Sequence, residues 1–159
     1  MLSGTKSEQF EVGLRVAKKS FGLGDVAVIG SKDRFTAIGA ATAMGHASNA
    51  YDIDDGHNII RAHPGTSFIG ALLSVAYDKD ASLKDLFVAM LVAYEASIRM
   101  GAAIMDYYKY AHSSGTFGSV GVAYSRLLDD LGKKYEVLSL YFKPYPCCRW
   151  VHPAIDSCI

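Results

Sequence analysis

Five histidines and a run of three aspartates are the residues with which this sequence could do acid–base chemistry. The aspartates Asp52, Asp54 and Asp55 lie within four residues, directly after a segment of small side chains. Carboxylates this close raise one another's pKa and suit a shared proton, which a general acid or base near neutral pH requires. The alternative is a solvated aspartate-rich turn or a helix cap.

The histidines lie in or beside segments that Gly, Pro or Ser residues mark as loops: His46, His57, His63, His112 and His152. Any one of them could be an ordinary surface or helix-end histidine. Loops that meet at one end of a helical bundle can build a pocket, however. Several histidines in separate loops therefore favour a shared site.

Groups that bind anions accompany these residues. The segment 112–118, His-Ser-Ser-Gly-Thr-Phe-Gly, precedes a predicted helix start, where free backbone N–H groups bind carboxylate or phosphate, although an ordinary N-cap has the same pattern. Basic side chains in or next to the other loops would suit a substrate with several carboxylates. We assign substrate binding to Asp55, Arg61, Ser113, Lys143 and Arg149.

The aspartate run does not have the pattern of a calcium loop. Its glycine falls one position early, and the twelfth position is His63 instead of glutamate. A magnesium-binding motif is conceivable because Asn58 follows the aspartate pair, but the sequence contains no second metal motif.

A zinc site is the other metal hypothesis. Cys147 and Cys148 are adjacent and lack the two-residue spacer of a chelating turn, although His152 follows them. A cysteine nucleophile has no base near it in the sequence. We expect no metal and no cofactor.

Composition limits the class of protein. The chain has 159 residues, 50% hydrophobic, and its sixteen Lys and Arg balance sixteen Asp and Glu. This is enough for a core, whereas a nucleic-acid binder needs clustered basic residues. The sequence has no basic-then-apolar signal pattern, no apolar run of the roughly 20 residues that span a membrane, and three cysteines. We expect a cytoplasmic protein that binds neither nucleic acid nor membrane.

The expected elements are mostly helices. Residues 1–35 have an irregular pattern with a short strand at 26–29. A run of small residues over about 36–50 predicts a buried helix that packs closely against its neighbours. Apolar spacing predicts helices over about 66–77, 82–105 and 116–128, and loops are expected at 51–65 and 107–115.

Two of these elements have specific expectations. Ser82 and Asp85 predict a capping box for the third helix, which is apolar almost all round and should be central. Residues 137–142 predict a strand for which no partner strand is visible, so a second copy of the chain is one possible partner. A loop at 143–152 leads into a helix at the end of the sequence. The fold class is mainly α, with a helical domain at 1–129 and an α+β fragment at 130–159.

Several segments, taken in order, resemble the MmgE/PrpD family. They are Ala47–Asp55, His63-Pro64, Ala93-Tyr94-Glu95, His112–Gly118, Lys143–Arg149 and His152–Asp156. The resemblance covers the chain from about Gly30 onward, and the Asp-x-Asp-Asp…His-Pro and Lys-Pro-Tyr-Pro-Cys-Cys-Arg segments are the most specific.

The resemblance implies a helical first domain, an α+β second domain and an active site between them. Members include 2-methylcitrate dehydratase, cis-aconitate decarboxylase and iminodisuccinate epimerase, so it implies metal-free lyase or isomerase chemistry on a small polycarboxylate, and we expect a homodimer. The matching active-site positions are Asp52, His63, His112 and His152, one of which would take the proton next to a carboxylate.

The sequence departs from the family pattern in several places. Compared with the family, it lacks the opening helices and the end of the second domain, and passes from the first domain into the second between Leu128 and Leu131, without the block that carries a lysine. Gly56 stands where the family usually has Thr or Ser. We therefore expect a 2-methylcitrate dehydratase-like lyase whose activity is reduced or absent. The alternative is a non-catalytic remnant that serves as a helical dimerisation module.

Overall fold

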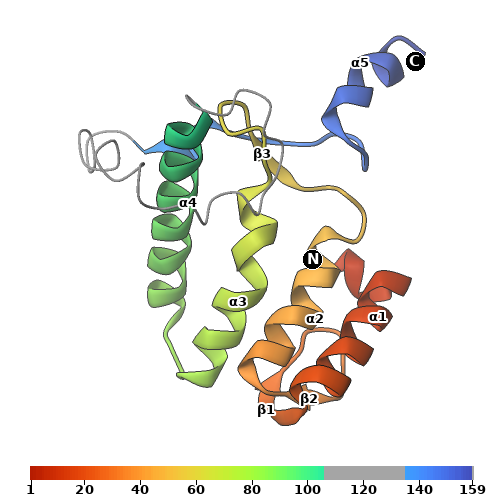
Figure 1. Ribbon diagram of the computed structural model, residues 1–159, viewed down its shortest axis with the longest axis vertical. Coiled ribbons are helices and arrows are strands. Elements are labelled where there is room, and N and C mark those ends of the chain that lie inside the picture. The colour runs from red at the N-terminus through yellow and green to blue at the C-terminus, as the bar shows by residue number, and fades with distance from the viewer. Residues whose placement is uncertain (106–134, 159) are drawn as a thin grey trace.

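The computed structural model describes residues 1–105 and 135–158 (Figure 1). The elements are α1 (Glu8–Val16), β1 (Leu23–Ala27), β2 (Arg34–Phe35), α2 (Ala37–Asn49), β3 (Asp55–His57), α3 (Pro64–Asp78), α4 (Leu83–Met105), β4 (Leu140–Phe142) and α5 (His152–Asp156). Short 3₁₀ turns at Ser3–Lys6, Glu136–Ser139 and Arg149–Val151 and a π-helical turn at Ala17–Phe21 complete them. The predicted mainly α fold with a small α+β part at the C-terminal end is confirmed.

The first 35 residues are regular, and the prediction of an irregular segment there is wrong. Ser7 caps α1 by accepting a hydrogen bond from the backbone N–H of Phe10 at 3.1 Å. The strand begins at Leu23 instead of Val26 and forms a hairpin with β2. α1 was missed although its sequence carries a helix start, with Ser7 as the cap and Glu8 and Glu11 in the first turn.

α2 is the buried helix that its small residues predict. Thr36 caps it by accepting from the N–H of Gly39 at 3.2 Å. A Cβ atom on Gly70 of α3 would lie 2.7 Å from the backbone oxygen of Ala41, so the two helices pack with almost no side chain between them. The core beside them is built from Phe10, Ala17, Val26, Val28, Phe35, Ala40, Ala43, Met44 and Ala47.

α3 and α4 confirm the predicted helices, and the capping box forms as expected. The backbone N–H of Asp85 donates to the Ser82 hydroxyl at 3.2 Å, and the N–H of Ser82 donates back to the Asp85 carboxylate at 3.3 Å. The turn between the two helices therefore ends where the sequence places it.

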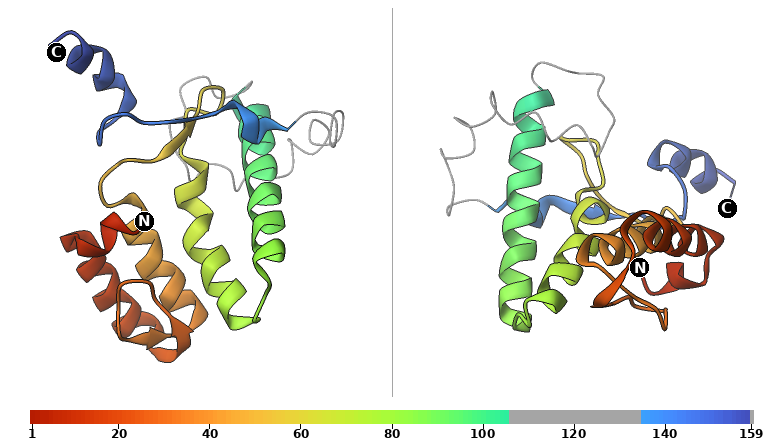
Figure 2. Two further views of the ribbon diagram at one scale, coloured as in Figure 1. Left: turned by 180° about the vertical axis from the view of Figure 1, so that it is seen from behind. Right: turned by 60° about the horizontal axis from the view of Figure 1, so that its bottom comes forward.

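α4 does not occupy the central place that its composition predicts. The four long helices pack in chain order, α1 on α2, α2 on α3 and α3 on α4, so α4 lies at the edge of the row (Figures 1 and 2). One of its faces exposes apolar side chains over 38–73% of their surface: Leu83, Phe87, Val88, Leu91 and Val92. The expectation of a central helix is therefore wrong, because the described helices cover it on one side.

Among the described residues, α4 is also long and apolar enough to cross a membrane by length and composition, over Leu83–Ala103. Charged residues interrupt this stretch at Lys84, Asp85, Glu95 and Arg99, so it differs from the uninterrupted apolar run that the sequence lacks. A core helix of a soluble protein meets the same measure, so it does not by itself indicate a membrane span.

The strand near the C-terminal end finds its partner within the chain. β4 pairs antiparallel with β3, with Gly56 opposite Tyr141, in the segment that was predicted to be only a loop. The first part of the predicted strand is instead a 3₁₀ turn, whose Val137 N–H donates to the Glu95 carboxylate at 2.9 Å. A short strand of three residues has too little pattern to be recognised, which is why β3 was missed.

The helix predicted at the end of the sequence is confirmed by α5, whereas three predictions fall outside the described residues. They are the helix at 116–128, the loop at 107–115 and the domain boundary at 129–130.

Candidate functional site

An open cleft of about 580 Å³ lies where α2 ends and α3 begins. It is lined by Gln9, Gly45, His46, Asn49, Asp52, Asp54, His63, Thr66, Ser67, Lys143 and Cys148. Of the site residues predicted from the sequence, the cleft brings together Asp52, His63 and Lys143.

Asp52 and Lys143 form the ion pair of this cleft. The Lys143 ammonium donates to Oδ1 of Asp52 at 2.6 Å and to its backbone oxygen at 3.1 Å. The lysine side chain is fully buried, whereas the aspartate side chain is 42% exposed. Lys143 directly follows β4, so the pairing of β4 with β3 carries the ammonium to the aspartate segment.

His63 is held in one orientation by the backbone. It precedes Pro64, the first residue of α3, and its Nδ1 lies 2.6 Å from the carbonyl oxygen of Asp55. A carbonyl only accepts, so Nδ1 carries a proton, and in the neutral ring Nε2 carries the lone pair. His63 can therefore act as a base or a ligand through Nε2.

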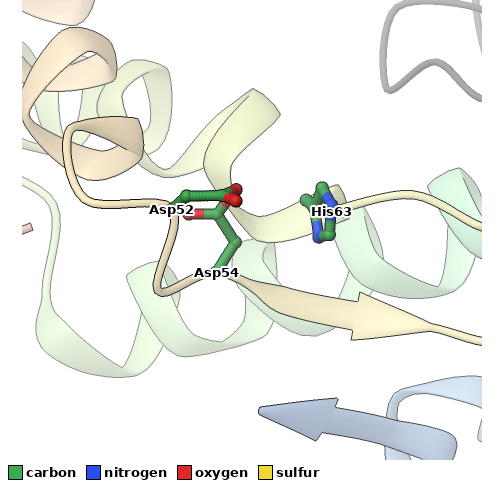
Figure 3. Close-up of side chains that lie close together, drawn as sticks. All are labelled: Asp52, Asp54 and His63. Carbon is green, nitrogen blue, oxygen red and sulfur yellow. The ribbon is translucent and has the colours of Figure 1, made fainter. Parts of the chain in front are cut away.

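Asp54 is buried beside this pair. Only 3% of the residue is exposed, and within the described part of the chain neither carboxylate oxygen has a hydrogen-bond partner. Burial raises the pKa of Asp54, while the nearby positive groups Lys143 and His63 act in the opposite direction. Asp52, Asp54 and His63 each offer one atom within 4.8 Å of the others and could hold a metal ion (Figure 3).

Asp55 has a different environment from Asp54, its neighbour in the sequence. Its Oδ2 accepts from the N–H of Gly65 in the first turn of α3 at 3.0 Å, and the Tyr94 hydroxyl also bonds its carboxyl. Burial raises the pKa of Asp55, and burial together with that carboxyl raises the pKa of Tyr94. The structure thus places Asp55, predicted to bind substrate, as a link between α3 and α4 outside the cleft lining.

Three further predicted residues lie outside the cleft lining. Arg61 is exposed in a turn with φ of +49°. Arg149 lies 4.1 Å above the centre of the Tyr141 ring and donates to the Asn58 side chain. His152 is buried.

His152 shares its surroundings with the cysteine pair. Its Nε2 lies 3.3 Å from the Cys147 backbone oxygen, and its ring packs edge-on against Tyr145. Within the described residues, the group that could hold a metal does not include these side chains. His112 and Ser113 lie outside the described residues.

The cleft also contains residues that were not assigned to the site from the sequence. His46, one of the five candidate histidines, and Asn49 line it from the last turn of α2. Their spacing of three residues places both on one helix face, a signal that could have identified them. Asp54 belongs to the predicted carboxylate cluster, but nothing in the sequence distinguishes it from Asp55.

Comparison with known proteins gives one match. The family model described as MmgE/PrpD N-terminal domain matches residues 1–129. No curated protein and no solved structure matches the chain.

Proposed function

Because the chain belongs to the MmgE/PrpD family, we propose that its cleft catalyses acid–base elimination on a small dicarboxylate or tricarboxylate. The match supports a lyase-like role at the level of the family. The substrate type, like that of 2-methylcitrate dehydratase, is part of the proposal.

The observation that carries the proposal is the meeting of three groups on one cleft. Lys143 contributes a buried ammonium, Asp52 contributes a carboxylate 2.6 Å from it, and His63 contributes an imidazole with one nitrogen fixed by a carbonyl. A base and a positive charge fixed close together suit the removal of a proton next to a carboxylate.

The proposed reaction uses these groups in sequence. Nε2 of His63 takes the proton from the carbon next to a substrate carboxylate, and the electron pair of that C–H bond forms the new C=C bond. The C–O bond of the neighbouring hydroxyl breaks, and the hydroxyl leaves as water after it receives a proton from an acid, for which the resemblance offers His112. The Lys143 ammonium stabilises the negative charge that develops on the substrate carboxylate.

Proton NMR in D2O with the whole chain tests the proposal. We expect 2-methylcitrate to lose its signal by elimination, or cis-aconitate to lose its signal by the reverse addition of water, with deuterium exchange next to a carboxylate, and expect Lys143→Gln to slow this by about a hundredfold or more. Lys79→Gln, in an exposed lysine at the far end of α3, is the matched control and should leave the rate unchanged. A folded protein that leaves both substrates untouched would contradict the proposal.

A second candidate function is self-association without catalysis. The open apolar face of α4 favours it, because a continuous row of exposed Leu, Phe and Val side chains is typical of an interface. The occupant we propose is a second copy of the chain, packed face to face along this row.

The molar mass in solution, measured by light scattering on a sizing column, tests this candidate. We expect a dimer that Phe87→Glu converts to a monomer, whereas Ile38→Glu, at an exposed position of α2, leaves it dimeric. A monomeric wild type, or flotation with lipid vesicles that Phe87→Glu abolishes, would contradict this candidate.

A further inference from the structure

We propose that the cleft binds a divalent transition-metal ion through Asp52, Asp54 and His63. This goes beyond the proposed elimination and does not depend on it, since binding requires no substrate.

The geometry of the three side chains is the first argument. The atoms they offer lie within 4.8 Å of one another, and Figure 3 shows the two carboxylates together with the imidazole facing them. Ligands of one ion lie about 3 Å apart, so side-chain rotations of modest size bring the three into a ligand set.

The state of Asp54 is the second and independent argument. Only 3% of Asp54 is exposed, and the residue lines the cleft. Within the described structure, its two carboxylate oxygens have no hydrogen-bond partner. A buried polar group without a partner is costly, and an ion at this point would satisfy it.

The orientation of His63 is the third argument. A histidine that ligates a metal commonly donates its other ring N–H to a carbonyl or a carboxylate, which fixes the ring and its tautomer. The 2.6 Å bond from Nδ1 to the Asp55 carbonyl has this form and directs Nε2 to act as the ligand.

Lys143 occupies one carboxylate oxygen of Asp52 and leaves the other for a metal ion. Its ammonium bonds Oδ1 of Asp52, so Oδ2 remains as the ligand atom. With Asp52 and Asp54 both ionised, the single positive charge of Lys143 leaves one net negative charge among these two carboxylates and the ammonium, and a cation would neutralise it. A mixed set of two carboxylates and an imidazole suits Mn²⁺, Fe²⁺, Co²⁺ or Zn²⁺ better than Mg²⁺ or Ca²⁺.

The ion has a consequence for the proposed reaction. Nε2 of His63 cannot bind a metal and accept a proton at once. The metal-bound chain should therefore be inactive in elimination, and its binding can be measured when no reaction is detected.

The experiment titrates Mn²⁺ into the EDTA-treated full chain and follows free Mn²⁺ by electron paramagnetic resonance. We expect one site, with affinity lowered at least tenfold by Asp54→Asn and by His63→Gln. Asp33→Asn, in an exposed turn, is the matched control and should bind as the wild type does. Far-UV circular dichroism verifies that each variant is folded.

A measurement on the wild type keeps the proposal testable if a variant does not fold. Bound Mn²⁺ should broaden the imidazole proton signals of His63 before those of His152. The absence of binding at millimolar Mn²⁺, binding that survives Asp54→Asn, or broadening that spares His63 would each overturn the proposal.

Discussion

The two apolar clusters of the molecule differ in size and in what surrounds them. The N-terminal cluster unites nine buried side chains from α1, the π-helical turn that follows it, α2 and the β1–β2 hairpin. The site-side cluster, beneath the β3–β4 pair, contains only Ile60, Ala62 and Ile98 among the described residues. Around it lie buried polar groups instead: Asp54, Asp55, His57, Glu95, Arg99 and Lys143.

This difference indicates two ways of holding the same chain together. Close apolar packing is non-directional and tolerates small shifts, whereas buried polar groups need specific partners. The N-terminal cluster should therefore respond to changes of volume, and the site-side cluster to the loss of single hydrogen bonds or charges.

The largest effect is expected from Glu95, which joins the site-side cluster to the chain that follows α4. Glu95 pairs with Arg99 at 3.0 Å, both nearly buried, and accepts the Val137 N–H. Glu95→Ala should cost about 3 kcal/mol, because it removes a carboxylate that pairs with a buried guanidinium and accepts a backbone N–H. Hydrogen exchange should show the loss at β4, while α1 and α2 stay protected.

Glu11→Ala, in an exposed glutamate of α1, is the control and should change little. If α1 and α2 lose protection together with β4 in the Glu95 variant, the two clusters form one cooperative unit, which would contradict their separate responses.

The next effect tests the N-terminal packing at Gly70. A Cβ there would lie 2.7 Å from the Ala41 backbone oxygen, which cannot move aside cheaply. Gly70→Ala should cost about 2 kcal/mol through overpacking, measured by urea unfolding. Gly45→Ala is the matched control, since a Cβ at that position meets nothing within 4 Å and should stabilise the helix. Equal effects of the two substitutions would show that helix propensity, not close packing, determines the change in the free energy of unfolding.

A smaller effect is expected at Gly56, in the middle of β3. A Cβ there would touch the Tyr141 ring, the far end of a half-buried side chain that can shift. Gly56→Ser should cost about 1 kcal/mol, and the combination with Tyr141→Ala should recover part of that loss. Thermal unfolding of the wild type, the two single variants and the double variant measures the coupling between the two positions. Additive losses of stability would contradict the coupling.

The smallest effect is expected at the capping box. Ser82→Ala removes the acceptor of the Asp85 N–H and should cost about 1 kcal/mol or less, far from both clusters. Ser82→Thr should restore most of the stability in the same thermal unfolding measurement. A loss larger than that of Gly70→Ala would show that the turn before α4 matters more than the packing.

The sequence predicts what depends on neighbouring residues. The capping box at Ser82 and the buried α2 follow from local spacing, and the structure confirms them. The pairing of β3 with β4 and the edge position of α4 depend on the arrangement of whole elements, which local patterns do not encode.

The same distinction applies to the site. Loops that carry Asp52, His63 and Lys143 were predicted to meet, and the cleft contains all three. The unlike environments of Asp54 and Asp55 could not be predicted, because they arise from the turn into α3 and from Tyr94 of the next helix.

The bond between Lys143 and Asp52 has a consequence for the order of folding. It joins residues 91 apart in the chain, so the ends of a long loop must meet before the cleft exists. During synthesis at about 5–20 residues per second, the aspartate waits roughly 5–20 s for its lysine. The contacts among α1, α2 and α3 are closer in sequence and can form during this interval. The cleft is thus completed after the body formed by α1, α2 and α3, and a ribosome that pauses before Lys143 would hold a folded body with an unfinished site.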